Sequence, residues 1–221
     1  MRRRRTSSSR SIAAAIFVAS GSAASPAFAL DTWDGDFDAP PAKVRSDFMA
    51  GLSGGLLLGS ANGFPNEAGK VGDPDFEAGT GFGLGTGGTL WIGGALHDAF
   101  TVGIGQTGGA ISGNSVQGQG GAFVLRLEGY PLFGAGGVWE NIGLSASFGA
   151  GAFQLKDAED EDEDLADGGL MSFVGGGVLW EALRFGPVAM GPSLEYLYLY
   201  SESLEGHTAG LFWRTVFYGG P

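Results

Sequence analysis

Four charged residues stand in stretches where apolar and small residues alternate. They are Arg126, Glu128, Glu195 and Arg214. Successive side chains of a β-strand point to opposite faces, and all four fall on the face of small residues, opposite the large apolar ones. Charges that leave water must be paired. Two arginines and two glutamates on one face therefore predict a buried ion-pair cluster. The alternative is a set of ordinary surface pairs on a soluble sheet.

The last chain reversal brings two of these charges together in the prediction. For an antiparallel hairpin that turns near residues 203–204, Glu195 lies close to residues 212–214. Arg214 is then the expected cross-strand neighbour of Glu195. Arg126 and Glu128 are two positions apart on one face of their strand, so we expect them to join the same cluster.

A serine hydrolase is the first catalytic hypothesis to weigh. His207 follows a stretch that contains Ser201, Ser203, Glu202 and Glu205. A Ser–His–acid triad is recognised by its geometry, and serines in a loop do not supply it. In lipid A deacylases the serine stands two residues after the histidine, whereas this chain has Ala209 there. We therefore predict no enzyme activity.

Two glycine motifs match the G-x-G-x-x-G pattern of dinucleotide-binding sites. They are GLGTGG at 83–88 and GIGQTG at 103–108. Such a site needs a helix directly after the glycines, because the phosphate binds at the helix N-terminus. No helical pattern follows either motif, so we predict no nucleotide and no other cofactor.

The acidic stretch DAEDEDEDLAD at 157–167 is the one candidate for a cation site. Asp160, Asp162 and Asp164 supply the oxygen ligands that hard cations prefer. A calcium loop of the EF-hand type that starts at Asp160 needs glycine at its sixth position, where Leu165 stands. We therefore favour a solvated, self-repelling loop and predict no metal site; weak binding of a divalent cation is the alternative.

Eight runs with a period of two residues predict the strands that position these side chains. They span residues 47–59, 81–93, 100–108, 120–130, 144–153, 170–181, 188–200 and 207–218. Between them, 61–80, 109–119 and 157–169 are polar connections, and 94–99 and 182–187 are short ones. Each run has roughly the 9–11 residues with which a tilted strand crosses a bilayer. The fold class we predict is all-β, an eight-stranded antiparallel up-and-down transmembrane barrel.

The start of the chain predicts export. Arginines at 2–5, an apolar run at 12–24 and the AFA tripeptide at 27–29 have the order of a secretory signal peptide, so we expect residues 1–29 to be cleaved. Residues 30–43 read as an acidic, proline-containing periplasmic leader, and residues 44–221 as the barrel. The net charge of −12 argues against nucleic acid, and the absence of cysteine argues against a disulfide scaffold.

The face that carries only small side chains indicates which side of the sheet lines the barrel interior. In the stretch LSASFGAGAF at 144–153, Leu144, Ala146 and Phe148 alternate with serines and glycines. A solvent-facing strand normally carries charges and threonines, whereas a narrow barrel interior needs small residues beside a few large ones. We therefore expect the apolar face to meet lipid. The side chains predicted to fill the lumen are Met49, Trp91, Tyr130, Phe153, Phe173, Phe212 and Tyr218.

On these features residues 43–221 resemble the small eight-stranded outer-membrane barrels, the group of the OmpA transmembrane domain, OmpX and OmpW. The last strand, GLFWRTVFY, offers Leu211, Trp213 and Phe217 in the alternation that the assembly machinery reads, although Gly219, Gly220 and Pro221 follow. The resemblance implies a location in the outer membrane. It also implies contact with lipid, lipopolysaccharide and the barrel-assembly machinery, and a lumenal arginine–glutamate cluster that blocks passage.

The function we predict is a non-enzymatic, monomeric barrel with a structural or surface-interaction role. The first alternative is a narrow OmpW-like channel for small or hydrophobic solutes. The second alternative is a soluble exported barrel of the lipocalin type that binds an apolar ligand. The second alternative requires large apolar residues such as Leu125 and Leu144 to face inward.

Overall fold

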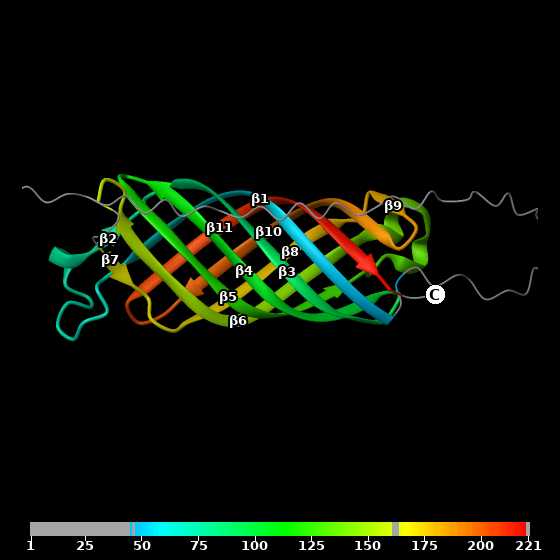
Figure 1. Cartoon of the computed structure of the whole chain (residues 1–221), viewed down its shortest axis with the longest axis horizontal. Helices are drawn as coiled ribbons and strands as arrows, with labels where there is room; N and C mark the ends of the chain where they lie inside the picture. The colour runs from blue at the N-terminus through cyan, green and yellow to red at the C-terminus, as the bar shows by residue number, and fades with distance from the viewer. Residues whose placement is uncertain (1–44, 46, 161–163, 220–221) are drawn as a thin grey trace, which may run out of the picture. The chain divides into compact units, whose positions relative to one another are not determined.

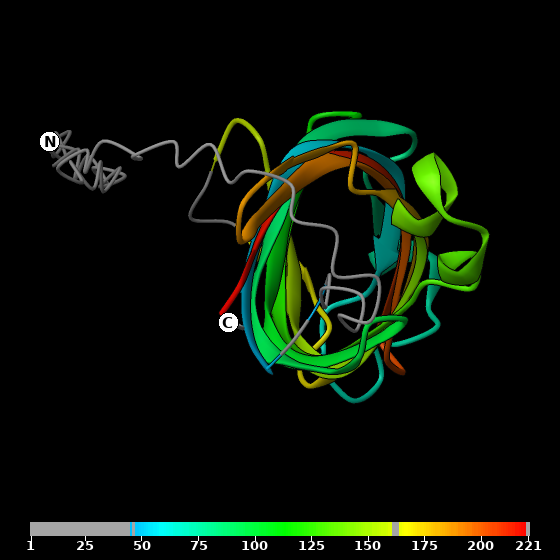
Figure 2. The same cartoon turned by 90° about the vertical axis from the view of Figure 1, so that its right-hand side faces the viewer.

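The fold is a closed antiparallel β-barrel of eight long strands (Figures 1 and 2). The computed structural model describes residues 45, 47–160 and 164–219, so the predicted signal peptide (1–29) and leader (30–43) lie outside the described residues. The long strands are β1 (Asp47–Gly63), β3 (Gly83–His97), β4 (Phe100–Gly113), β5 (Val116–Gly129), β6 (Ile142–Asp157), β8 (Met171–Trp180), β10 (Val188–Tyr200) and β11 (Leu204–Tyr218). Each pairs with the next, and β11 pairs with both β10 and β1, which closes the barrel. The predicted fold class is confirmed.

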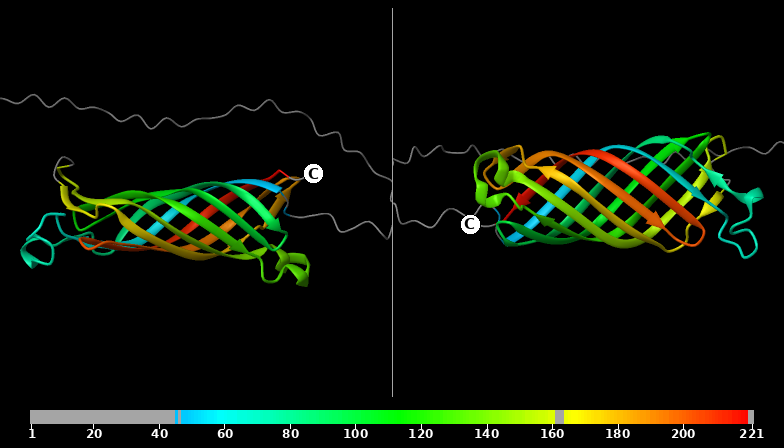
Figure 3. Two further views of the ribbon diagram at one scale, coloured as in Figure 1. Left: turned by 90° about the horizontal axis from the view of Figure 1, so that it is seen from below. Right: turned by 180° about the vertical axis from the view of Figure 1, so that it is seen from behind.

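Short elements occupy the two ends of the barrel. The strands β2 (Ala78–Gly79) and β7 (Asp164–Asp167) and the 3-10 helix η1 (Pro74–Phe76) lie at one end, which we call the loop end. The strand β9 (Leu183–Phe185) and the 3-10 helices η2 (Phe133–Ala135) and η3 (Gly137–Asn141) lie at the other, the terminal end, where β1 begins and β11 stops (Figure 3). Among the residues described, no helix is long and apolar enough to cross a membrane.

The outer face of the barrel is apolar, and the inner face combines small and polar residues with several large buried side chains, as predicted from the sequence. In β6, Leu144 and Phe148 are 53% and 46% exposed, whereas Ser145 and Ser147 are buried. Leu125 also faces outward, which contradicts the lipocalin alternative. All seven side chains predicted to fill the lumen are buried: Met49, Trp91, Tyr130, Phe153, Phe173, Phe212 and Tyr218.

The predicted polar connection at 109–119 is wrong. Residues 109–113 continue β4 and residues 116–119 belong to β5, with a tight turn between them at Asn114 and Ser115. Both turn residues have a positive φ, 50° and 60°, as in the turns that match the twist of a hairpin. Outward polar residues such as Gln119 made this segment read as a loop, although Ile111 on the inner face is fully buried.

The lumen contains two apolar layers. Near the loop end lie Leu57, Ile111, Phe153, Phe173 and Phe212, among other buried residues. These five side chains help to line a small cavity of about 40 Å³. Nearer the terminal end, the second layer contains Met49, Trp91, Ala189, Val216 and Tyr218. The charged network described next shares the lumen with this second layer.

Candidate functional site

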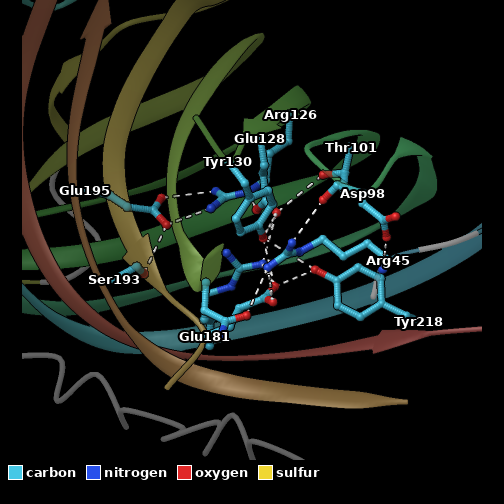
Figure 4. A network of polar contacts seen from close by, with 12 residues as sticks. Arg45, Asp98, Thr101, Arg126, Glu128, Tyr130, Glu181, Ser193, Glu195 and Tyr218 are labelled. Carbon is cyan, nitrogen blue, oxygen red and sulfur yellow. Dashed lines mark hydrogen bonds and ion pairs between the residues drawn. The ribbon is translucent and has the colours of Figure 1, made fainter. Parts of the chain in front are cut away.

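The four predicted charged residues meet in the lumen. Figure 4 shows three of them, Arg126, Glu128 and Glu195. Arg126 and Glu128 lie two residues apart on β5, Glu195 lies on β10 and Arg214 on β11, and each is at most 5% exposed. Their strands alternate between outward apolar and inward small residues, so each charge points inward. The small inward neighbours, such as Ser147 on β6, leave room for the long arginine side chains.

Arg126 is the centre of the predicted cluster. Its Nη1 and Nη2 donate to Oε2 and Oε1 of Glu195 at 3.1 and 2.9 Å, a two-point contact across the barrel. Its Nε donates to Glu128 Oε1 at 2.8 Å. Arg214 Nη2 donates to the other oxygen of Glu128 at 3.0 Å. Paired contacts of this kind are the strongest charge-assisted hydrogen bonds.

The expected pairing of Glu195 with Arg214 is wrong. In the β10–β11 ladder Glu195 lies opposite Gly210, and Arg214 lies opposite Gly191. The hairpin turns earlier than residues 203–204, because the amide of Ser201 donates to the carbonyl of Leu204 and Tyr200 already faces Glu205. Arg214 therefore reaches Glu128 on the far wall of the lumen.

Four further residues extend the cluster toward the terminal end. Glu181, just after β8, accepts hydrogen bonds from Arg45 Nη2 at 2.7 Å, from Tyr130 Oη at 2.8 Å and from Tyr218 Oη. The sequence pattern placed Glu181 only near a strand end, and placed Tyr130 and Tyr218 only as lumen fillers. Arg45 precedes the first alternating run, so the pattern gave no signal for it.

Arg45 lies at the terminal end of the barrel and contacts several elements there. Its guanidinium carbon lies 3.4 Å from the centre of the Tyr130 ring, and Nη1 donates to the carbonyl of Asp98 at 3.0 Å. Nη2 also lies 3.4 Å from the side-chain oxygen of Asn141. One side chain therefore links β1 to the β3–β4 turn, to the β5–β6 connection and to Glu181.

Electrostatics favour the ionised form of Glu181. Burial alone would raise the pKa of Glu181, but the charges of Arg45 and Arg214 and the hydrogen bond from Tyr218 outweigh it, so the pKa lies below its ordinary value of 4.5. Burial and the nearby Glu128 raise the pKa of Tyr130 well above 10. At neutral pH the carboxylate is therefore charged and the phenol neutral, and the phenol serves as a hydrogen-bond donor.

The other candidate residues lie apart from this network. His207, on the outer face of β11, has its Nδ1 2.6 Å from Tyr196 Oη, and its ring stacks on Tyr198 at 4.5 Å. The two glycine motifs lie inside β3 and β4, with no helix after either. In the described part of the chain, no group of three or more His, Cys, Asp or Glu could hold a metal ion. Asp162 lies outside it, and Asp164 lies 3.5 Å from Lys156 Nζ.

Three solved structures with similar folds can be compared with the chain. The attachment invasion locus protein Ail of Yersinia pestis has a TM-score of 0.45 at 12% identity, over 77% of this chain and 99% of that one. Neisserial surface protein A (NspA) has a TM-score of 0.46 at 9% identity, over 77% of this chain and 96% of that one. Outer membrane protein OprG of Pseudomonas aeruginosa has a TM-score of 0.39 at 12% identity, over 79% of this chain and 98% of that one. No family model and no curated protein matches the sequence. These neighbours are small outer-membrane barrels, whereas the fold stated above rests on this chain's own strand pairing.

Proposed function

We propose that this chain is an outer-membrane barrel with a closed lumen and a structural or surface-interaction role, without enzyme activity. The apolar outer face supports a lipid environment, because large apolar side chains such as Leu90, Ile104 and Leu125 are exposed on it. The sheet is also closed, so it has no free strand edge that could pair with another chain. The inner face holds the charges. This arrangement is the reverse of a water-soluble barrel.

The observation that carries the proposal is the network across the lumen. Glu128, Glu181 and Glu195 are each 5% exposed or less, and each is held by at least one arginine. An ion entering the lumen would have to shed water and displace a charge-assisted contact, which is costly in a low dielectric. The apolar layer at the loop end is a second barrier, since apolar constrictions exclude water. Two barriers in series support a closed barrel over a channel.

The proposal includes a topology. Residues 1–29 act as a cleaved signal peptide, and residues 30–43 form a leader in the periplasm. The terminal end of the barrel then faces the periplasm, and the loop end faces outward with the acidic segment 157–167. The barrel-assembly machinery would read the outward residues Leu211, Trp213 and Phe217 of β11. Outer-membrane lipid and lipopolysaccharide would surround a monomer.

Conductance in planar bilayers tests the closed lumen. We expect the wild-type barrel, inserted from detergent, to pass almost no current. Migration on a denaturing gel with and without boiling would first establish that the inserted protein is folded. Appreciable single-channel conductance of the folded wild type would refute the closed barrel and favour the narrow channel.

Membrane placement has its own test in Leu125, which is 43% exposed on the outer face of β5. Leu125→Asp places a charge against lipid and should impair insertion into vesicles, whereas Leu125→Val should insert normally. Equal insertion of the two variants would contradict the assignment of this face to lipid.

A further inference from the structure

The connection between β5 and β6 exposes large apolar side chains at the terminal end of the barrel. We call residues 131–141, which contain η2 and η3, the η2–η3 segment. Its Val138 and Trp139 are 61% and 56% exposed, and its only charged residue is Glu140. The connection at 64–77 at the loop end differs, because it carries five charged residues: Glu67, Lys70, Asp73, Asp75 and Glu77. The η2–η3 segment therefore has the composition of a contact surface, whereas the loop-end connection suits water.

The η2–η3 segment lies beside the barrel wall. Seen along the barrel, the two green 3-10 helices stand outside the ring of strands (Figure 2). They also project past the strands at the terminal end in both views of Figure 3. In a membrane, lipid surrounds the barrel on this side of the wall. The segment is therefore placed over lipid and not beneath the lumen.

The outer face of β6 sets the height of the segment relative to the bilayer. Its outward residues are apolar from Ile142 to Ala152, and the polar Gln154 and Lys156 follow toward the loop end. Residues 142–152 span roughly 25 Å along the barrel axis, because a strand rises about 3.4 Å per residue and is tilted by about 40°. The apolar band of an outer-membrane barrel is about 25 Å tall. Its edge therefore falls at Ile142, directly after η3, where the lipid headgroups begin.

Exposed apolar side chains also surround the point where the segment joins the wall. Ile142 lies opposite Trp180, which is 41% exposed. A few residues further along the chain, Leu183 and Phe185 of β9 are 45% and 64% exposed, and both lie opposite outward residues of β10. Tryptophan is enriched where a membrane meets water, because its ring is apolar and its N–H is polar. Trp139 and Trp180 therefore mark this level as an interface with lipid.

Hydrogen bonds to the barrel hold both ends of the segment. The amide of Tyr130 donates to the carbonyl of Ala99 at 2.8 Å, and the amide of Glu181 donates to the carbonyl of Asn141 at 2.9 Å. The segment is therefore tied to the strands on either side, and the barrel determines where Trp139 lies.

We propose that the η2–η3 segment is an interfacial membrane anchor, which places Val138 and Trp139 among the lipid headgroups at the terminal end. In the topology above, these headgroups belong to the periplasmic leaflet. With one acidic residue and no basic one, the segment gains its binding from apolar burial and the amphipathic indole, not from attraction to anionic lipid. The inference rests on the outer-membrane placement proposed above. The anchor sets the depth of the barrel in the bilayer.

Nitroxide labels on single cysteines test the depth of the segment, because the chain has no cysteine of its own. Val138→Cys reports on the segment. Leu125→Cys, on the outer face of β5, is the lipid reference, and Glu67→Cys, whose native side chain is 63% exposed at the loop end, is the water reference. The labelled full-length barrels are folded into phosphatidylcholine vesicles, and electron paramagnetic resonance measures the accessibility of each label to oxygen and to a nickel chelate. Oxygen concentrates in lipid and the chelate in water, so the ratio of the two rises with depth. We expect the ratio at residue 138 to lie clearly between the two references.

A second substitution tests the role of the indole. Trp139→Ser, introduced into the labelled Val138→Cys barrel, should lower the ratio at residue 138 toward the water reference. Trp213→Ser is the matched control, because Trp213 is 51% exposed on the outer face of β11, away from the segment. It should leave the ratio at residue 138 unchanged. Migration on a denaturing gel with and without boiling shows that each variant is folded.

Three results would overturn the anchor. A label at residue 138 as accessible to the nickel chelate as the water reference, beside a lipid-like label at residue 125, would leave the membrane placement standing and favour a protein partner for the segment. A ratio at residue 138 equal to that at residue 125 would place the segment in the apolar core and not at the interface. An equal effect of Trp139→Ser and Trp213→Ser would show that the indole does not hold the segment. A water-like label at residue 125 is a different failure, because it refutes the proposed membrane placement and the anchor with it.

Discussion

Replacing Glu128 with alanine is the most direct test of the lumen network. Glu128 is fully buried and accepts hydrogen bonds from Arg126 Nε at 2.8 Å and from Arg214 Nη2 at 3.0 Å. After the change, Arg126 keeps Glu195, but the nearest carboxylate to Arg214 is Glu181, at 3.9 Å. A buried arginine is then left without a close partner.

The size of the effect follows from the unpaired charge that Arg214 would then carry inside the barrel. Removing one partner of a buried ion pair costs about 3–5 kcal/mol, because the other charge remains out of water. At about 1.4 kcal/mol per factor of ten, the folded-to-unfolded ratio should fall roughly a hundredfold to several thousandfold. The control is Glu67→Ala. Glu67 pairs with Lys70 at 2.9 Å, but its side chain is 63% exposed, so its loss should cost less than about 1 kcal/mol.

Reversible urea unfolding in detergent micelles or lipid vesicles, followed by far-ultraviolet circular dichroism, measures both variants. The double variant Glu128→Ala with Arg214→Met should recover part of the loss, because it removes the unpaired charge as well. If Glu128→Ala unfolds within 1 kcal/mol of Glu67→Ala, the network is not a dry, closed barrier and the argument for a sealed lumen fails.

Three further changes probe other parts of the lumen. Gly51→Ala places a Cβ 2.1 Å from the Trp91 ring, so we expect the urea midpoint to fall by the equivalent of about 1–3 kcal/mol. The control is Gly54→Ala. Its added Cβ would have its nearest neighbour 4.0 Å away, so the midpoint should stay nearly unchanged. The pKa of Glu181 is lowered on folding, so its contribution to the stability of the barrel is complete above pH 4.5 and is lost as the pH falls through the lower folded value. Urea midpoints measured between pH 7 and pH 3 should therefore fall more steeply for the wild type than for Glu181→Gln. Parallel curves would contradict this. Arg45→Ala should speed hydrogen exchange of the amide of Tyr130 at the terminal mouth more than that of Ala61 at the loop end, and equal acceleration would show that Arg45 does not hold the mouth.

The barrel wall was predictable because its pattern is local. Apolar and small residues alternate within each strand, so Leu144 and Ser145 can be assigned to opposite faces without knowing any other strand. The abundance of glycine and serine on one face decided which face was inside. The strand ends were less predictable, because outward polar residues above the apolar zone, such as Gln119, look like loop residues although they continue the ladder.

The pairing inside the lumen was not predictable in the same way. Which charges meet depends on the register of hairpins and on contacts across the barrel, and residues 201–206 are nearly all polar, so their composition does not mark the turn. The assumed turn put Arg214 beside Glu195, whereas the ladder puts Gly210 there. Arg45 lies outside every alternating run. Its role depends on the β3–β4 turn and the β5–β6 connection, which only the closed barrel brings together.

The pattern predicts one cluster of all four charges with Arg214 beside Glu195, and the structure has the cluster with a different order of contacts. In a set of isolated ion pairs, each pair could open alone. Here the contacts form a chain: Glu195 binds Arg126, which binds Glu128, which binds Arg214, and Arg45 binds Glu181 beside it. Arg126 and Glu128 each keep a second partner when one contact breaks, so a single break does not free them. If the lumen is closed as proposed above, its opening requires several contacts to break together, and this cooperativity is the physical reason to expect a barrel that stays shut.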